Sequence, residues 1–195
     1  RLTAESIRDA MLATSGQLDP SRGGSSLGLE LKGNIKGLGG KVNPPTWTGN
    51  IPEYIKNRRS VYLPFKRERP LGELEILSAF DFPHPNDITG ARSNTTVATQ
   101  ALFLLNAPFV KQQAAKLAER LQQHQPADDR ARINHLYLLT VNCPPEDYEI
   151  EIALTFLEQC TQDLIAASDA TKARSAAWTQ LCHAVLASNR FLFRE

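Results

Sequence analysis

The spacing of apolar residues predicts a chain that is helical over most of its length. The first helix is predicted from Ala4 to about Ser15, because Thr3 can cap its start and Gly16 can end it. Apolar or small side chains recur along this segment at helical spacing and share one face: Ile7, Ala10, Met11 and Thr14. This face is predicted to pack against the rest of the fold.

The C-terminal half carries further helical patterns, each beginning at a capping or first-turn signal. The predicted starts are Thr96, Pro108, Asp128, the run Pro144 to Asp147, and about Thr171, with the last helix ending near Ser188. Residues 146–195 contain neither proline nor glycine. Short links between helices of this length are typical of a bundle, so we expect a mainly α fold with a helical bundle in the C-terminal half.

The N-terminal third has a different pattern. Nine of the 11 glycines lie between residues 16 and 49, which predicts a glycine-rich loop region. The segment Arg58 to Phe65 reads RRSVYLPF, where Val61 and Leu63 alternate with polar or aromatic neighbours. This alternation predicts one or two short strands, and Pro64 would place such a strand at an edge. A brief helix or turn is expected at 72–79.

The net charge of the 195 residues is close to zero, but the charges are distributed unevenly along the chain. The chain carries 22 basic and 21 acidic side chains, for a net charge of +1. Residues 1–69 hold a net +6 and residues 70–195 a net −5, so we predict a single domain, 1–195, with a basic N-terminal part and an acidic helical part. The balance argues against a nucleic-acid-coating protein, and no apolar run is long enough for a membrane span.

Cysteine usage excludes two further classes. Cys143, Cys160 and Cys182 are widely spaced, with no CxxC string. The usual zinc patterns and a small disulfide scaffold are therefore not expected, and neither is a metal site.

A basic run with aromatic neighbours is the first candidate for binding. Its predicted ligand-binding residues are Arg58, Arg59, Tyr62, Lys66 and Arg67. Guanidinium groups and aromatic rings suit sulfate, phosphate or carboxylate groups, so an anionic polysaccharide is a predicted partner. The alternative is structural: charged residues protect an edge strand from aggregation, and surface arginines pair with acids elsewhere in the fold.

A turn-rich loop at 80–96 holds the second candidate. Asp81, His84 and Asp87 are spaced D-x-x-H-x-x-D, and Arg92 follows closely. These groups could exchange protons or bind a metal, which would make the chain an enzyme or part of one. The alternative is that the acids cap turns while His84 packs between two prolines.

Several strings resemble a known family: LTAESIRDAMLATSGQLD, RRSVYLPFKRERP, FDFPHPNDITGARSNTTVATQALFLLNAPFV and AWTQLCHAVLASNRFLF. They are similar to the planctomycete-specific C-terminal domain known as domain of unknown function 1553. The resemblance implies a C-terminal module of large exported proteins, often joined to a cytochrome c-like domain, with no established activity. The haem-attachment string CxxCH is absent, so no cofactor is expected in this domain.

The chain departs from the family pattern in two regions. Cys143 stands where the family commonly has an arginine before a proline, and Arg190 replaces a usual acidic residue. A charge pair between these regions is therefore expected to be lost or exchanged.

Three functions follow from these patterns. The first is a non-catalytic helical module that packs against neighbouring domains and binds an anionic ligand. The second is an enzyme with a polar site in the 81–94 loop. The third is pure scaffold, in which the family strings serve the core. The scaffold reading expects one set of residues to pack together: Ala101, Leu102, Leu104, Leu105, Trp178, Leu181 and Phe191.

Overall fold

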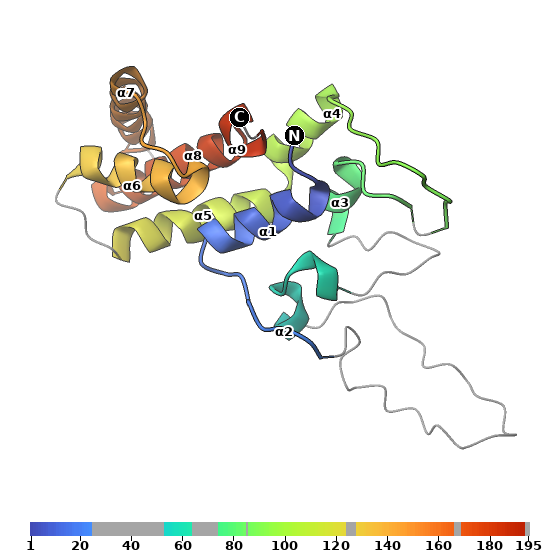
Figure 1. Ribbon diagram of the computed structural model, residues 1–195. Coiled ribbons are helices and arrows are strands. Elements are labelled where there is room, and N and C mark those ends of the chain that lie inside the picture. Colours follow the sequence, from blue (N-terminus) through green and yellow to red (C-terminus); the bar gives the residue numbers. More distant parts are fainter. Residues whose placement is uncertain (25–52, 64–73, 85, 124–127, 166–168, 194–195) are drawn as a thin grey trace, which may run out of the picture.

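The computed structural model describes residues 1–24, 53–63, 74–84, 86–123, 128–165 and 169–193, which form a body of packed helices (Figure 1). The elements are α1 (Ala4–Thr14), α2 (Glu53–Lys56), the 3-10 helix η1 (Ser60–Tyr62), α3 (Glu75–Ala79), α4 (Ala98–Asn106), α5 (Pro108–Gln123), α6 (Asp129–Val141), α7 (Asp147–Ile165), α8 (Ala170–Leu186) and α9 (Asn189–Leu192). The predicted mainly α fold is confirmed.

Helix α8 lies at the centre of the predicted C-terminal bundle, packed against α5 and α7. Trp178 is its largest buried side chain, at 1% exposure. Buried apolar side chains from α1 through α9 form one hydrophobic cluster, which extends from Ala4 to Leu192. Removal of this apolar surface from water is the main source of stability.

Helix α1 follows its sequence signals closely. Thr3 Oγ1 accepts a hydrogen bond from the Ser6 N–H at 3.3 Å, and Gly16 ends the helix with a φ of +74°. This left-handed conformation suits glycine because it has no Cβ. Arg120 of α5 donates to the carbonyls of Ala13 and Thr14, at 3.0 and 2.7 Å. The last carbonyls of α1 are thereby satisfied and the helix is fixed to α5.

The predicted strand at Arg58 to Phe65 is wrong where the structure describes it. Ser60–Tyr62 forms η1, and the described ranges contain an isolated bridge between Asp19 and Arg58 but no strand. The reason is that α1 side chains bind the backbone here. The Asp9 carboxylate accepts from the Ser60 N–H at 2.9 Å, and Arg8 donates to the Arg58 carbonyl at 2.9 Å. The backbone groups of Arg58 and Ser60 that would pair with a neighbouring strand are therefore already hydrogen-bonded to side chains of α1.

Helix α4 packs only partly as the scaffold reading expected. Leu104 is 3% exposed, but Leu102 and Leu105 are 58% and 54% exposed, and Ala101 is exposed as well. The inward face instead holds Gln100, whose Oε1 accepts from Arg1 at 3.0 Å. The expectation that Ala101, Leu102 and Leu105 lie in the core is wrong.

Candidate functional site

A cavity of about 550 Å³ opens between α1, η1 and the segment at 82–92. We call it the Arg59–Arg92 cavity. Its lining consists of Glu5, Ser6, Asp9, Arg59, Ser60, Val61, Phe82 and Arg92. The two arginines come from the two sequence candidates, the basic run and the turn-rich loop. The fold thus places one cation from each candidate at the same cavity.

Arg59 reaches this cavity because its neighbours are fixed. Arg58 is 8% exposed, donates to the carbonyls of Ser21 and Gly23, and lies 4.4 Å from the centre of the Tyr62 ring. Ser60 is held by Asp9 on the other side. Arg59 between them is exposed, and no residue of the described ranges binds its guanidinium. Within the described part of the chain, its positive charge is therefore unpaired at the cavity.

Arg92 also lines the cavity. Its Nη1 donates to both carboxylate oxygens of Glu5, at 2.7 and 2.9 Å, and its guanidinium lies 5.9 Å from the centre of the Phe82 ring. Half of the Arg92 side chain is still exposed, at 51%. The Glu5 carboxylate and the ring orient the guanidinium without covering it.

The other predicted ligand-binding residues lie elsewhere. The guanidinium of Arg58 and the ring of Tyr62 contact each other, and neither lines the cavity. Lys66 and Arg67 fall outside the described residues, as does most of the glycine-rich region at 16–49. Of the five predicted residues, Arg59 is the one that lines this cavity in the part of the chain that the structure describes.

The polar loop places its predicted catalytic groups in different surroundings. Asp81 has a left-handed φ of +61°, and its carboxylate accepts from the Thr95 N–H and from Arg1, both at 2.8 Å. His84 and Asp87 are exposed. The bonds from Thr95 close the loop, and the bond from Arg1 fixes it to the N-terminal residue. Within the described ranges, no group of three His, Cys, Asp or Glu side chains is placed to hold a metal ion.

The Asp81 contacts predict a specific acid sensitivity. The Thr95 N–H, followed by Arg1, lowers the pKa of Asp81. A lowered folded-state pKa stabilises the fold above the ordinary aspartate pKa of ~3.9, and this stabilisation is lost as pH falls through the folded-state pKa. Asp81→Asn should cost about 1 to 2 kcal/mol at neutral pH. Asparagine tolerates the same left-handed backbone, so the loss reports on the charge.

Urea denaturation of the wild type and Asp81→Asn across pH 3 to 7 checks this prediction. The stability difference should shrink as pH falls into the range where the wild-type carboxyl is protonated. A difference that stays constant over the whole range would contradict it. Asp87→Asn, at an exposed position in the same loop, is the matched control and should change stability little.

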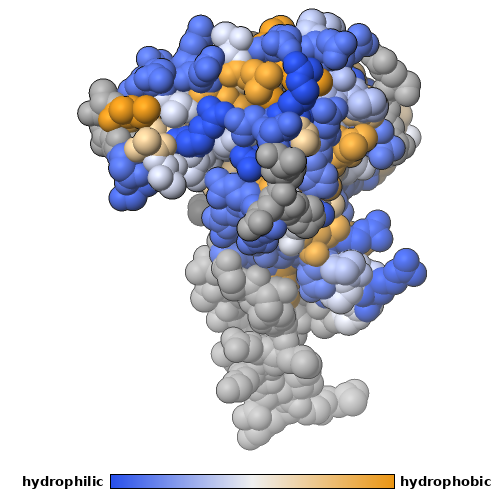
Figure 2. All heavy atoms as spheres, turned by 90° about the vertical axis from the view of Figure 1, so that its left-hand side faces the viewer, coloured by the Kyte–Doolittle hydropathy of each residue, from blue (hydrophilic) through white to orange (hydrophobic). Residues whose placement is uncertain are grey.

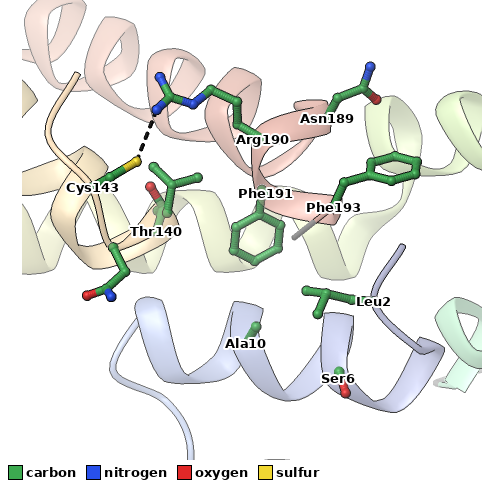
Figure 3. Close-up of a pocket in the computed structure, with 11 residues that line it drawn as sticks. Leu2, Ser6, Ala10, Thr140, Cys143, Asn189, Arg190, Phe191 and Phe193 are labelled. Atoms are coloured by element: carbon green, nitrogen blue, oxygen red, sulfur yellow. Dashed lines mark hydrogen bonds between the residues drawn. The ribbon is translucent and has the colours of Figure 1, made fainter. Parts of the chain in front are cut away.

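A second, larger cleft of about 850 Å³ lies between α1, the end of α6 and α9 (Figure 3). Here Arg190 points to Cys143, with Nη2 3.0 Å from Sγ, and it also pairs with Glu149. Burial raises the pKa of Glu149, but hydrogen bonds from Arg190 and the Glu146 N–H outweigh it and hold the pKa below its usual range. The expected charge pair is thus exchanged for one between Arg190 and Glu149.

This second cleft was not found by sequence reasoning, although the departures at Cys143 and Arg190 point to it. Its apolar walls include Leu2, Phe191 and Phe193. Glu149 neutralises the one arginine of this cleft, whereas the Arg59–Arg92 cavity also contains Arg59, which has no ion-pair partner among the described residues. In the described ranges, no helix is long and apolar enough to span a bilayer.

The fold and the cavity together define an all-α module with a surface site lined by two arginines. Residues 1–157 match the family model described as "Protein of unknown function (DUF1553)", also called PSD1. The chain therefore belongs to this family, as the sequence strings predicted. Searches of curated proteins and of solved structures each found no match.

Proposed function

We propose that this chain is a non-catalytic helical module of a larger exported planctomycete protein, which packs against neighbouring domains and binds an anionic polysaccharide. The observation that supports the binding role is the Arg59–Arg92 cavity. Both arginines line this one cavity and are exposed, and Arg59 has no ion-pair partner among the described residues. Guanidinium forks bind carboxylate and sulfate groups through paired hydrogen bonds.

The rest of the lining favours a sugar acid over a dense polyanion. Glu5 and Asp9 also line the cavity, so its two arginines face two carboxylates. The charges of the lining therefore nearly cancel, which gives closely spaced phosphates little net attraction, whereas carboxylates can accept hydrogen bonds from sugar hydroxyl groups. The ring of Phe82 and the exposed side chain of Val61 offer apolar contact to the carbon face of a sugar. A sulfated or carboxylated glycan has all three kinds of group.

The enzymatic alternative has less support from the geometry. Asp81 is bonded to Arg1 and Thr95, whereas Arg92 is bonded to Glu5. His84 Nδ1 accepts from the Asn86 N–H, at 3.3 Å. These contacts direct the side chains of the predicted polar site to separate partners within the described part of the chain.

Titration with polygalacturonate tests the proposal, with dextran sulfate as a dense polyanion that should bind less well and uncharged dextran as the control polymer. Arg59→Ala and Arg92→Ala should each weaken binding at least about tenfold, because a hydrogen bond to a charged group contributes about 1.5 to 3 kcal/mol. Binding should also weaken as salt is raised. Arg130→Ala removes an exposed arginine of α6, far from the lining residues, and should leave affinity unchanged.

Absent binding, or binding that neither arginine substitution weakens, would contradict the proposal. A check of unfolding midpoints separates lost binding from lost structure. Arg58→Ala is a poor test, because Arg58 is buried and holds the carbonyls of Ser21 and Gly23.

A further inference from the structure

Two cavities meet at one residue of α1. The cleft shown in Figure 3, which we call the Phe191–Phe193 cleft, is lined on one side by Leu2, Ser6 and Ala10 of α1. The Arg59–Arg92 cavity is lined by Glu5, Ser6 and Asp9 of the same helix. Side chains three or four residues apart on a helix are neighbours, with Cβ atoms about 5 to 6 Å apart. The two cavities therefore adjoin along α1, and the small, exposed side chain of Ser6 lies between them.

The walls of the Phe191–Phe193 cleft are fixed by contacts between distant segments. The Leu2 N–H donates to the Leu192 carbonyl, at 2.8 Å, which holds the start of α1 against α9. Arg190 of α9 binds Glu149 in the first turn of α7 and Cys143 between α6 and α7. A cleft with fixed walls loses little conformational freedom when a ligand binds. Its volume of about 850 Å³ lies within the range of about 300 to 1,000 Å³ that is usual for ligand sites.

The lining of this cleft suits the uncharged parts of a sugar. Phe193 is 38% exposed, so part of its ring is open to the apolar face of a sugar ring. Asn142 and Asn189 also line the cleft, and their side-chain amides have no hydrogen-bond partner among the described residues. An amide both donates and accepts hydrogen bonds, as a sugar hydroxyl group does. Because the one arginine of the cleft is paired with Glu149, the lining has little net charge.

Exposed apolar side chains alone do not distinguish this cleft. Figure 2 shows further apolar surface on the helical body, on the side where α6 and α7 lie. The Phe191–Phe193 cleft differs because it combines an aromatic ring with free amides and because it adjoins the Arg59–Arg92 cavity at Ser6. An acidic polysaccharide has a matching order of groups: a carboxylate on one sugar, and ring faces and hydroxyl groups on the sugars beside it.

We propose that the two cavities form one extended glycan-binding groove across α1. An acidic sugar lies in the Arg59–Arg92 cavity, and adjoining sugars of the same polymer lie in the Phe191–Phe193 cleft. This inference rests on the proposed function, because it extends the same polysaccharide beyond the first cavity. Two linked contacts bind more tightly than either contact alone, since the second contact forms within the complex. The extended groove therefore selects a polymer over a short acidic sugar.

Calorimetric titration with digalacturonate and with a long oligogalacturonate tests this extension. Digalacturonate should occupy the Arg59–Arg92 cavity alone, whereas the long oligomer should reach both cavities. Phe193→Ala should weaken binding of the long oligomer by about threefold to tenfold, because it removes the ring contact. It should bind digalacturonate like the wild type, since Phe193 does not line the Arg59–Arg92 cavity. The matched control is Tyr148→Ala, which removes a 63% exposed ring of α7 outside both cavities and should leave both affinities unchanged.

Ser6→Leu tests the connection between the two cavities. Leucine has a high helix propensity, so α1 is retained, and its larger side chain obstructs the path across the helix. The preference of this variant for the long oligomer over digalacturonate should fall. Ser6→Ala leaves the path open and should retain the wild-type preference.

The outcomes separate this extension from the proposed function. A long oligomer that binds Phe193→Ala and Ser6→Leu as tightly as the wild type would overturn the extended groove, and so would equal weakening of both ligands by Phe193→Ala. If Arg59→Ala still weakens both ligands, the proposed function survives either result. A wild type that binds neither ligand would overturn both proposals. Because Phe193 and Ser6 are exposed, unfolding midpoints close to that of the wild type are expected and establish that the variants are folded.

Discussion

Replacement of Trp178 by alanine is expected to destabilise the fold by about 3 to 5 kcal/mol, the range for truncation of a large buried aromatic residue. Trp178 is 1% exposed at the centre of α8, the helix that packs against both α5 and α7. The guanidinium of Arg132 lies 5.0 Å from its ring centre. Truncation therefore leaves a cavity between three helices and removes a cation–π contact.

Urea denaturation measures the loss, as a shift of the midpoint with an unchanged slope. Trp178→Phe is the informative companion. The indole N–H has no hydrogen-bond partner among the described residues, so phenylalanine retains aromatic packing and removes an unsatisfied donor. Its cost should be well below that of alanine. Equal losses for the two variants would contradict this account of the site.

The second large effect is expected at Asp9, where alanine should cost about 2 to 3 kcal/mol, because it leaves a buried cation without its counter-charge and a part-buried N–H without an acceptor. The carboxylate accepts from the Ser60 N–H and hydroxyl, at 2.9 and 2.7 Å, and from Arg8 at 3.2 Å. Arg8 is only 2% exposed, and burial lowers its pKa whereas Asp9 acts in the opposite direction. Without Asp9, the buried Arg8 cation loses its counter-charge, although it still donates to the carbonyls of Lys56 and Arg58, and the Ser60 N–H loses its acceptor.

Asp9→Asn separates charge from hydrogen bonding, because the amide oxygen can still accept from Ser60. The free energy of unfolding of Asp9→Asn should lie between those of the wild type and Asp9→Ala. Thermal and urea unfolding of the three proteins provide the comparison. A loss below about 1 kcal/mol for Asp9→Ala would place this pair among ordinary surface ion pairs and refute its buried role.

Helix positions were predictable where the signal is local. Asp128 is the N-cap residue of α6 and accepts from the Ala131 N–H at 2.7 Å, as its place in the sequence predicted. Thr96 was a plausible cap for α4, but Val97 occupies the N-cap position. The Val97 N–H donates to Gln100 Oε1, at 3.4 Å. The start of α4 therefore lies one residue later than predicted, because the side chain of Gln100 binds the Val97 N–H.

Contacts between distant segments were not predictable from periodicity. The apolar pattern of α4 is visible in the sequence, but Leu102 and Leu105 face outward because Gln100 turns inward to meet Arg1. The meeting of Arg59 and Arg92 depends on α1, since Asp9 holds Ser60 and Glu5 holds Arg92. No local pattern in the sequence predicts that Arg59 and Arg92 line the same cavity. The family strings did predict membership, and residues 1–157 match its model.

The position of α1 couples the proposed ligand to folding. Glu5, Ser6 and Asp9 form one wall of the Arg59–Arg92 cavity, and Ile7 and Met11 of the same helix are fully buried. The cavity therefore exists only while α1 is docked in the core. By thermodynamic linkage, a ligand bound there stabilises the folded state by RT ln(1 + [L]/Kd), about 2.7 kcal/mol at a hundredfold excess over Kd. The glycan would act as a folding ligand for the N-terminal part of the domain.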